Sequence, residues 1–279
     1  MALVKFDDFS YKYYGADSLA LKKINLTIDN GEYVVITGPS GCGKTTLCRA
    51  INGLVPRFHR GYIAGHVYVD EKDTREHEVA HFAAIAGLVF QNPENQLVTL
   101  NVEKEIAFGP ENLGVNPVEV RRRVEEIIDL LDLEHLRDKH PHEMSGGEQQ
   151  RVAMAATLAL NPQILVADEP TSNLDPKSAE KILEIISTLN KRGMTVVLVE
   201  HRLDLVAKEA TRVVLMDRGR IVADGTPTEV LVADICQDIG VGIPKATEIY
   251  KRLNAKGLRL GSVPLTGEEL ALLIQEGTV

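Results

Sequence analysis

Apolar and polar residues alternate along the first thirty positions of the chain, and this period of two predicts β-strands. The continuous apolar run Tyr33–Thr37 that follows is typical of a strand buried on both faces. A glycine-rich loop at 38–43 and a helical run at 45–52 come next. Strand, loop and helix in this order form half of a βαβ unit.

The same signals continue along most of the chain. Apolar runs and alternations predict further strands at 62–70, 85–91, 164–167, 196–199 and 213–217. Between about 93 and 150 the character becomes helical, with apolar residues at 120, 124, 127, 128 and 131. Another helix is predicted at 178–190. We therefore expect an α/β core that contains a helical insertion.

The tail from residue 226 predicts short helices and no strand. Thr226 with Glu229, and Thr266 with Glu269, have the N-cap to N3 spacing of a capping box. Short helices are marginal in water on their own. The tail is therefore expected to pack on the tail of a partner, with folding back on its own chain as the alternative. Six apolar residues have spacings that could form the face involved: Ile235, Ile239, Ile249, Leu253, Leu270 and Leu273.

Composition narrows the class of protein. The chain has 279 residues and a formal charge of −9, and its 44% apolar and 25% charged residues are ordinary for a globular protein. The acidic balance argues against a nucleic-acid partner, which needs clustered Lys and Arg. Three cysteines fit a reducing compartment. No signal peptide or run of membrane-spanning length is visible. We expect a cytosolic chain whose membrane role would come through another polypeptide.

Residues 38–45 match the phosphate-binding pattern G-x-x-x-x-G-K-[ST]. Backbone N–H groups and the following helix N-terminus would bind phosphate oxygens. Lys44 would reach the β- and γ-phosphates, and the Thr45 hydroxyl would bind Mg²⁺. A glycine-rich turn without function is the alternative, and the flanking strand and helix disfavour it. The residues expected to hold the nucleotide here are Gly38, Pro39, Ser40, Gly41, Cys42, Gly43, Lys44, Thr45 and Thr46.

Two carboxylates follow the predicted strand at 164–167. Asp168 suits the coordination shell of Mg²⁺. Glu169 suits a general base that takes the proton of an attacking water molecule. Such a pair alone could be a solvated turn, but the phosphate loop upstream favours the catalytic interpretation.

The segment Ser145-Gly146-Gly147-Glu148-Gln149 resembles the signature of ATP-binding-cassette (ABC) ATPases. The common form has Gln directly after the glycines, and we expect Glu148 at that position to tune contacts rather than abolish nucleotide binding. Ser145 also suits a helix N-cap. The resemblance implies that Ser145, Gly146 and Gly147 face the γ-phosphate held by the opposite subunit of a dimer.

The resemblance extends to single positions elsewhere. It implies that Gln91 senses Mg²⁺ and the attacking water, and that Asp175, in the segment 172–175, lies at the dimer interface. It also implies that His201 contacts the γ-phosphate. A lone histidine after a strand could instead have a purely structural role.

One aromatic residue upstream of the phosphate loop is expected to stack on adenine. The resemblance favours Tyr11, and Tyr13 and Tyr14 lie close enough to take the same role. A strand-end tyrosine with only a structural role is the alternative.

Residues 90–96, residues 105–114 and the tail from 243 to 270 resemble the ATPases of energy-coupling-factor (ECF) transporters, so the resemblance covers essentially the whole chain. It implies a pair of ATPase subunits, identical or related, on the cytoplasmic face of the membrane. They would dock on a transmembrane coupling protein, and a separate membrane protein would capture a vitamin or a transition metal ion.

We therefore expect an α/β fold of the P-loop NTPase class with a mixed β-sheet. Residues 1–225 would form the nucleotide-binding domain, with a helical subdomain at about 91–151, and residues 226–279 a helical dimerisation appendage. ATP and Mg²⁺ are the expected substrate and cofactor.

The expected function is the ATP-hydrolysing subunit of an ECF importer. The ATPase of a conventional ABC importer is the alternative in the same class. A soluble ABC ATPase of DNA repair or translation is disfavoured, because no long coiled coil, metal-binding cysteine set or basic arm is visible. A regulatory cassette without catalysis is disfavoured because Lys44, Asp168, Glu169 and His201 are all present.

Overall fold

Two β-sheets form the framework of the chain. The computed structural model describes residues 2–258 and 260–276. Within them, one sheet has six strands, in the order β10 (Arg220–Gly225), β9 (Arg212–Asp217), β3 (Tyr33–Thr37), β8 (Thr195–Val199), β7 (Ile164–Asp168) and β6 (Ala86–Val89). The other has four, in the order β2 (Leu21–Asp29), β1 (Ala2–Tyr13), β4 (Gly61–Val69) and β5 (Lys72–Asp73). The first sheet is mixed, because β10 runs antiparallel to β9 while the other pairs are parallel. The second sheet is antiparallel.

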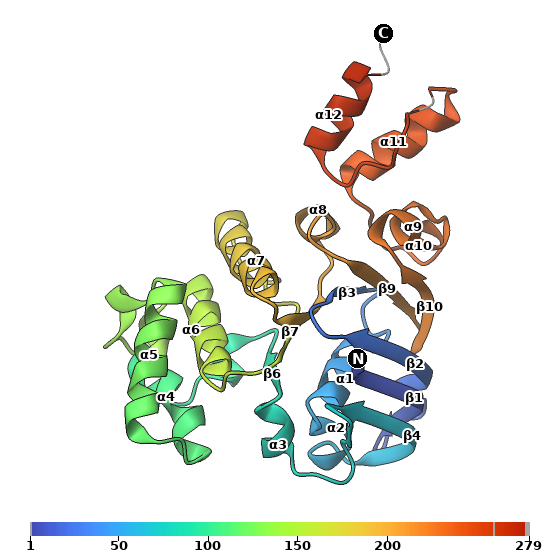
Figure 1. Cartoon of the computed structure of the whole chain (residues 1–279). Coiled ribbons are helices and arrows are strands. Elements are labelled where there is room, and N and C mark those ends of the chain that lie inside the picture. Colours follow the sequence, from blue (N-terminus) through green and yellow to red (C-terminus); the bar gives the residue numbers. More distant parts are fainter. Residues whose placement is uncertain (1, 259, 277–279) are drawn as a thin grey trace.

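Helices cover both sheets and form the tail. In the first part of the described chain they are α1 (Lys44–Ile51), α2 (Leu54–Arg57), α3 (Val79–Ala83), α4 (Val102–Asn112), α5 (Pro117–Leu131), α6 (Gly146–Leu158) and α7 (Pro176–Lys191). They continue with α8 (Leu203–Val206), α9 (Pro227–Val232), α10 (Ile235–Asp238), α11 (Lys245–Ala255) and α12 (Gly267–Glu276). Short 3₁₀ turns are η1 (Pro93–Asn95), η2 (Glu134–Leu136) and η3 (Pro141–Glu143). Figure 1 shows α4, α5 and α6 on one side, the four-stranded sheet on the other, and α11 and α12 projecting from one end.

Local sequence signals explain where the long helices begin. The side chains of Asn116, Ser145 and Asp175 cap α5, α6 and α7, and each accepts a hydrogen bond from a backbone N–H two or three positions later. A proline at the start of α5 and α7 adds a φ angle that is already helical. The helical layer continues to Leu158, beyond the predicted limit near 151.

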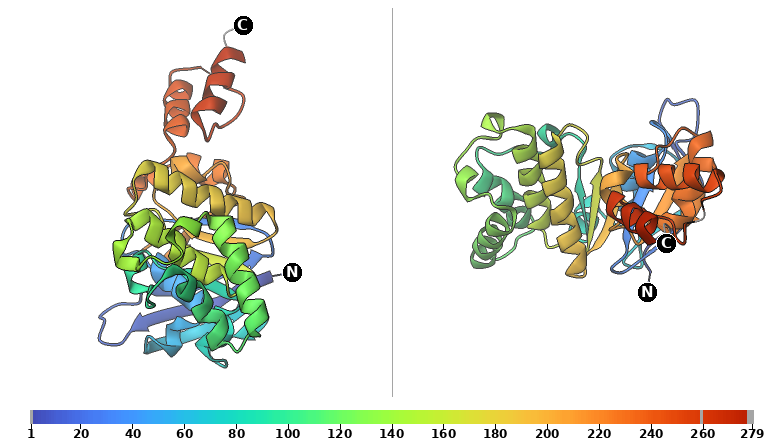
Figure 2. Two further views of the ribbon diagram at one scale, coloured as in Figure 1. Left: turned by 90° about the vertical axis from the view of Figure 1, so that its left-hand side faces the viewer. Right: turned by 90° about the horizontal axis from the view of Figure 1, so that it is seen from above.

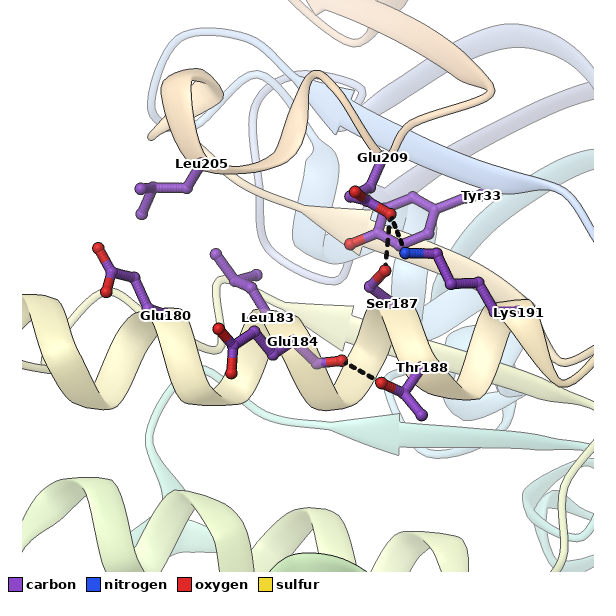
Figure 3. A pocket seen from close by; sticks show the side chains of 9 residues that line it. All are labelled: Tyr33, Glu180, Leu183, Glu184, Ser187, Thr188, Lys191, Leu205 and Glu209. Carbon is purple, nitrogen blue, oxygen red and sulfur yellow. Dashed lines mark hydrogen bonds and ion pairs between the residues drawn. The ribbon is translucent and has the colours of Figure 1, made fainter. Parts of the chain in front are cut away.

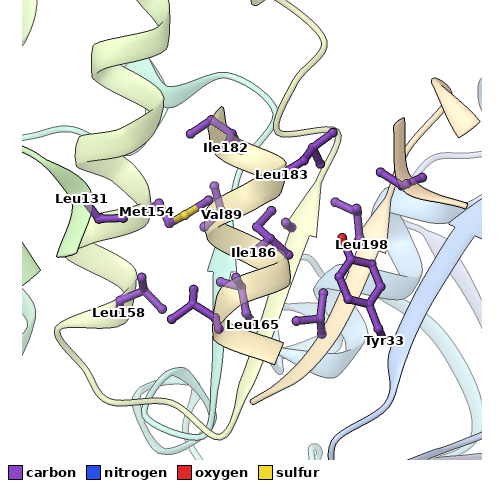
Figure 4. Packing of buried hydrophobic residues seen from close by; sticks show 14 of the residues in the cluster. Tyr33, Val89, Leu131, Met154, Leu158, Leu165, Ile182, Leu183, Ile186 and Leu198 are labelled. Carbon is purple, nitrogen blue, oxygen red and sulfur yellow. The ribbon is translucent and has the colours of Figure 1, made fainter. Parts of the chain in front are cut away.

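Neighbouring residues of the central strands pack on opposite faces of the six-stranded sheet. Val35, Leu165 and Leu198 belong to the core shared with α6 and α7, part of which Figure 4 shows. Val34 and Val166, one position away on the same strands, belong to the core under α1 and the four-stranded sheet. Burial on both faces explains why these strands are continuous apolar runs.

The α/β architecture with a mixed sheet confirms the predicted fold class. The sequence does not predict β10, because its residues are mostly half-buried or exposed and its apolar run is only three residues long, at 221–223. The predicted capping box of Thr226 and Glu229 is present at the start of α9. At α12 the hydroxyl of Thr266 accepts a hydrogen bond from the N–H of Glu269, but the Glu269 carboxylate accepts one from the N–H of Leu265, so the reciprocal bond of a capping box lies one residue away. Among the described residues, no helix is both long enough and apolar enough to cross the membrane.

The tail does not present the single apolar face that its spacing predicts. Ile235 and Ile239 pack against the main core on the α7 side of the sheet, where Cys236 of α10 is buried. Leu253 and Leu273 instead pack in a small separate cluster between α11 and α12. Folding back on the same chain, the alternative for the whole tail, thus applies to α9 and α10.

The remaining tail helices project from the rest of the chain and are joined to it at the base of α11, where Lys251 pairs with Asp234 at 2.8 Å and the N–H of Lys245 donates to Asp204 at 2.7 Å. Figure 2 shows α11 and α12 as a hairpin that projects beyond the sheets. Their cluster consists of Ala246, Leu260 and Leu270, and Ile249 on the same unit is exposed. Residue 1 of the expected nucleotide-binding domain and residues 259 and 277–279 of the expected appendage lie outside the described residues.

Candidate active site

The carboxyl ends of four parallel strands meet at one edge of the six-stranded sheet. These strands end at Thr37, Val89, Asp168 and Val199. Ligands of open α/β sheets bind outside this edge. A cavity of about 400 Å³ lies there, lined by Tyr13, Ala20, Ser40, Gly41, Gly43, Lys44, Thr45, Thr46, Gln91 and Glu169. Residues from separate predicted motifs therefore line one cavity.

A larger hollow, of about 480 Å³, lies beside α7 and contains none of the expected site residues. Figure 3 shows its hydrogen bonds, in which Glu209 accepts from Ser187 at 2.7 Å and pairs with Lys191 at 2.8 Å. We place the nucleotide phosphates in the smaller cavity, because Lys44 and the glycine loop line it. Another hollow, of about 470 Å³, shares Thr45 and Gln91 with this cavity and is also lined by Asp168.

The loop between β3 and α1 is tightly folded. Gly43 has a φ of +115°, and a Cβ at this position would lie 2.6 Å from the carbonyl oxygen of Ala20. Only glycine fits here without strain. Nζ of Lys44 donates hydrogen bonds to the carbonyl oxygens of Gly38 and Pro39 at 2.9 and 3.1 Å. The buried Lys44 side chain thus lies across the loop, within the predicted phosphate site.

Asp168 has a buried carboxylate oxygen without a partner. Its Oδ1 accepts no hydrogen bond from any residue that the structure describes, although buried polar atoms are nearly always paired. Burial raises the pKa of Asp168, while a hydrogen bond from Thr45 opposes the rise. The oxygen atoms of Asp168, Thr45 and Gln91 are of the kind that Mg²⁺ prefers. The residues present therefore fit a magnesium ion.

Glu169 is held between two side chains from distant parts of the sequence. Its Oε2 accepts a hydrogen bond from Nε2 of Gln91 at 2.9 Å, and Nε2 of His201 lies 2.9 Å from its Oε1. The backbone N–H of Glu169 donates to the carbonyl oxygen of Val199 at the end of β8. The carboxylate is only partly exposed. Its two side-chain partners therefore fix its orientation at the edge of the phosphate cavity.

The segment 145–147 is not brought to the phosphate loop of the same chain. Ser145 caps α6, and its N–H and hydroxyl both donate to Oε2 of Glu148 at 2.8 Å. Hydrogen bonds from Ser145 lower the pKa of Glu148. Gly146 lines a separate cavity of about 210 Å³ together with Gln91, and none of 145–147 lines the phosphate cavity. Asp175 is exposed at the start of α7.

The structure places Tyr11 in the core, against the expectation that it stacks on adenine. The side chain is 0% exposed, and its hydroxyl donates to the carbonyl oxygen of His59 at 2.7 Å. Burial raises the pKa of Tyr11 to about 12. Tyr13 instead lines the phosphate cavity, and its hydroxyl lies 3.2 Å from the hydroxyl of Thr46. Tyr14 is 91% exposed.

Sequence reasoning assigns no role to Glu200 or Thr171, which are buried beside the site. Thr171 is 0% exposed and Glu200 is 3% exposed. A carboxylate directly after the apolar run 196–199 is the same signal that identifies Asp168. That signal could have marked Glu200 as a residue of interest.

Comparison with known proteins agrees with this site. The family model described as ABC transporter matches residues 21–172. A putative ABC transporter ATP-binding protein of Methanosarcina mazei is 42% identical over 99% of this chain, which spans about half (48%) of that relative. An energy-coupling factor transporter ATP-binding protein, EcfA1, of Caldanaerobacter subterraneus is 39% identical over 98% of both chains.

Solved structures of ABC proteins have the same fold. The chain is similar to cbiO1 of Clostridium perfringens, part of the transporter complex cbiONQ, with a TM-score of 0.74, 30% identity and coverage of 91% of this chain and 95% of that one. A dimeric ATP-binding cassette bound to ADP and phosphate has a TM-score of 0.70 and 31% identity, with coverage of 80% and 98%. The geometry of the site and these similarities show that the chain belongs to the ABC transporter ATPase family.

Proposed function

We propose that this ABC ATPase is the ATP-hydrolysing subunit of an ECF-type importer for a vitamin or a transition metal ion. The observation that carries the proposal is the similarity to EcfA1, which covers 98% of both chains and so includes the tail as well as the nucleotide-binding part. A likeness confined to the cassette would favour any ABC transporter equally. The ATPase of a conventional ABC importer is the alternative.

In the proposed chemistry Glu169 accepts the proton of the water molecule that attacks the γ-phosphate. Its support is the position of the carboxylate, held by Gln91 and His201 at the rim of the phosphate cavity. Lys44 would bind the phosphates. Thr45, Asp168 and Gln91 would hold Mg²⁺, which neutralises phosphate charge when bound.

The same proposal includes a site shared between two subunits. Residues 145–147 do not line the phosphate cavity of their own chain, so a second subunit would have to supply them. A related cassette forms a dimer in the presence of ADP and phosphate. The second subunit would be a copy of this chain or a related ATPase. Asp175, exposed at the start of α7, would lie near that interface.

Exposed apolar residues of the helical layer support docking on a membrane partner at the cytoplasmic face. Four large apolar side chains between residues 98 and 113 are exposed to solvent. A partner that docks there would bury them, which is favourable. The residues are Val98, Leu100, Phe108 and Leu113.

Purification of the chain from its own membranes tests the proposal. The complex would contain a transmembrane coupling protein and a substrate-capturing membrane protein, and reconstituted vesicles would take up a vitamin or metal ion only with ATP. Lys44→Ala should abolish ATP binding and uptake while leaving the complex assembled. Recovery of the chain with a channel pair and an external binding protein would instead establish a conventional importer.

A further inference from the structure

A group of side chains, with Thr171 and Glu200 buried and Arg202 half-buried, joins the loop that carries His201 to the loop that follows Glu169. Oε1 of Glu200 accepts hydrogen bonds from the backbone N–H groups of His201 and Arg202 at 2.8 and 2.9 Å. Oε2 of the same carboxylate accepts a hydrogen bond from the hydroxyl of Thr171. The guanidinium of Arg202 donates to the carbonyl oxygen of Thr171 at 2.7 Å. Two loops separated by about thirty residues are thus tied together by side chains.

We infer that Glu200 is a positioning residue for ATP hydrolysis, because it fixes the backbone of His201 relative to Thr171 and so aims the imidazole at Glu169. This inference rests on the proposed roles of Glu169 and His201. Nε2 of His201 lies 2.9 Å from Oε1 of Glu169, and the imidazole is otherwise partly exposed. Its placement therefore depends mainly on its backbone, which Glu200 holds.

The low exposure of the group makes the connection stiff. Charge-assisted hydrogen bonds are roughly twice as strong as neutral ones. In a buried setting each is also expensive to leave unmade. Thr171 belongs to the segment 169–175, which ends at Asp175, the predicted interface residue. The N–H of Leu174 in this segment donates a hydrogen bond to the carbonyl oxygen of Thr171. Displacement of this segment would therefore be transmitted through Glu200 to His201.

Hydrolysis by the purified full chain tests the inference. Glu200→Ala should lower kcat by on the order of 10-fold to 100-fold, as expected when a reacting group is misplaced by about 1 Å. The KM for ATP and the affinity for a fluorescent ATP analogue should stay within about twofold, since Glu200 lines no part of the phosphate cavity.

Combination with His201→Ala separates positioning from general damage to the fold. If Glu200 acts through His201, Glu200→Ala should change the residual rate of His201→Ala by less than about twofold, because the two changes are not additive. A residue that only supports the fold would lower both rates by the same factor. Slow residual rates are measured with radiolabelled ATP at high protein concentration.

A second variant avoids the three unsatisfied donors that Glu200→Ala creates. Thr171→Val keeps the side-chain volume and removes only the hydroxyl, so it should also lower kcat with little change in KM. Thr171→Ser restores a hydroxyl and should restore most of the turnover. Ser187→Ala is the matched control, because Ser187 donates a similar hydrogen bond to Glu209 at 2.7 Å in the hollow beside α7 (Figure 3).

The outcomes distinguish this inference from the proposed catalytic roles. Wild-type turnover by His201→Ala would overturn the role of His201 itself. Impaired His201→Ala with wild-type turnover of both Glu200→Ala and Thr171→Val would overturn only the positioning role of Glu200. Equal losses from Glu200→Ala in the wild-type and His201→Ala backgrounds would also overturn it.

Discussion

His201 and Glu169 face each other at 2.9 Å across the ends of two neighbouring strands, β8 and β7, although 32 positions separate them in the sequence. Gln91 binds the other carboxylate oxygen at the same distance. An imidazole and an amide therefore fix both oxygens of the predicted base. A fixed base needs little reorganisation when the reaction begins, which lowers the barrier to proton transfer.

Glu169→Gln should leave ATP affinity within about twofold and reduce hydrolysis by about 10² to 10⁴, the usual contribution of a general base. The amide has nearly the same shape but cannot accept the proton of water. Single-turnover release of labelled phosphate measures the rate, and equilibrium binding measures the affinity. Glu184→Gln is the control, because it makes the same substitution at an exposed position on α7. This variant should hydrolyse ATP at the normal rate. Near-normal turnover by Glu169→Gln would remove this residue from the role of base.

Tyr13→Ala should weaken ATP binding by about 5-fold to 150-fold, since stacking of an aromatic ring on a base contributes about 1–3 kcal/mol. Tyr11→Phe should leave binding unchanged and destabilise the chain by about 1 kcal/mol, because the hydrogen bond to the His59 carbonyl oxygen is lost. Calorimetric titration with ATP and with GTP measures the nucleotide affinity of both variants, and thermal unfolding measures the stability of Tyr11→Phe. If Tyr14→Ala alone weakens binding, the exposed tyrosine is the stacking residue.

The sequence predicts best those residues whose role follows from adjacent positions. The sequence identifies Lys44 because it directly follows the glycine-rich loop 38–43. It identifies Asp168 because it directly follows the apolar run 164–167. The burial of Tyr11 could not be predicted, because β1 has irregular register between Phe6 and Phe9 and again between Phe9 and Tyr11. The first irregularity places an extra residue in β1 and so changes which face Phe9 and Tyr11 take, whereas the second places the extra residue in β2.

Contacts between residues far apart in the sequence could not be predicted, either beside the site or in the tail. The partner of Glu200 is Thr171, 29 positions away, and only the order of the strands brings them together. In the tail, Ile239 and Ile249 have equally apolar side chains, yet one packs on the main core and the other is exposed. Spacing identifies an apolar face but not the surface that covers it.

Asp168→Asn should remove the dependence of ATP binding on Mg²⁺ while stabilising the nucleotide-free chain by about 1 kcal/mol, because the amide removes a carboxylate charge that burial disfavours. The variant loses a buried charge whose Oδ1 has no hydrogen-bond partner among the described residues. Thermal unfolding without nucleotide measures the stability, and ATP titrations with and without EDTA measure the metal dependence. Asp138→Asn, at an exposed position, should change neither. An affinity for ATP that still falls on adding EDTA would exclude Asp168 from the metal site.

Gly146→Asp should stop hydrolysis while single chains still bind ATP, because it places a carboxylate near the γ-phosphate held by the partner. Gly146 suits this test better than Gly147. A Cβ at Gly147 would lie 2.8 Å from Oγ of Ser178, whereas the nearest atoms to a Cβ at Gly146 are 3.9 Å away. Gly146→Ala is therefore the control for space alone.

Mixing Gly146→Asp with Lys44→Ala gives the sharper result. A mixed pair contains one site with both changes and one site with neither, so shared sites predict partial recovery of hydrolysis. Sites complete within one chain predict none. Tagged chains confirm that mixed pairs form, and absence of recovery in such pairs would contradict the shared site.

Removal of α11 and α12 tests whether they hold the pair together without nucleotide. The cut should follow Ile243, because a cut after Asp224 would also remove Val230, Leu231 and Cys236 from the main core. Loss of such side chains costs about 1.5–3 kcal/mol each.

The shortened chain should remain folded, bind ATP and sediment as a monomer, whereas the full chain should sediment as a pair. Ile249 and Leu272 are 46% and 60% exposed on α11 and α12, and the cluster beneath them is small. A second tail would bury such side chains. Equal association of the two chains in nucleotide-free sedimentation would show that α11 and α12 do not maintain the pair. A full chain that is monomeric alone but pairs with a related ATPase would establish a heterodimer.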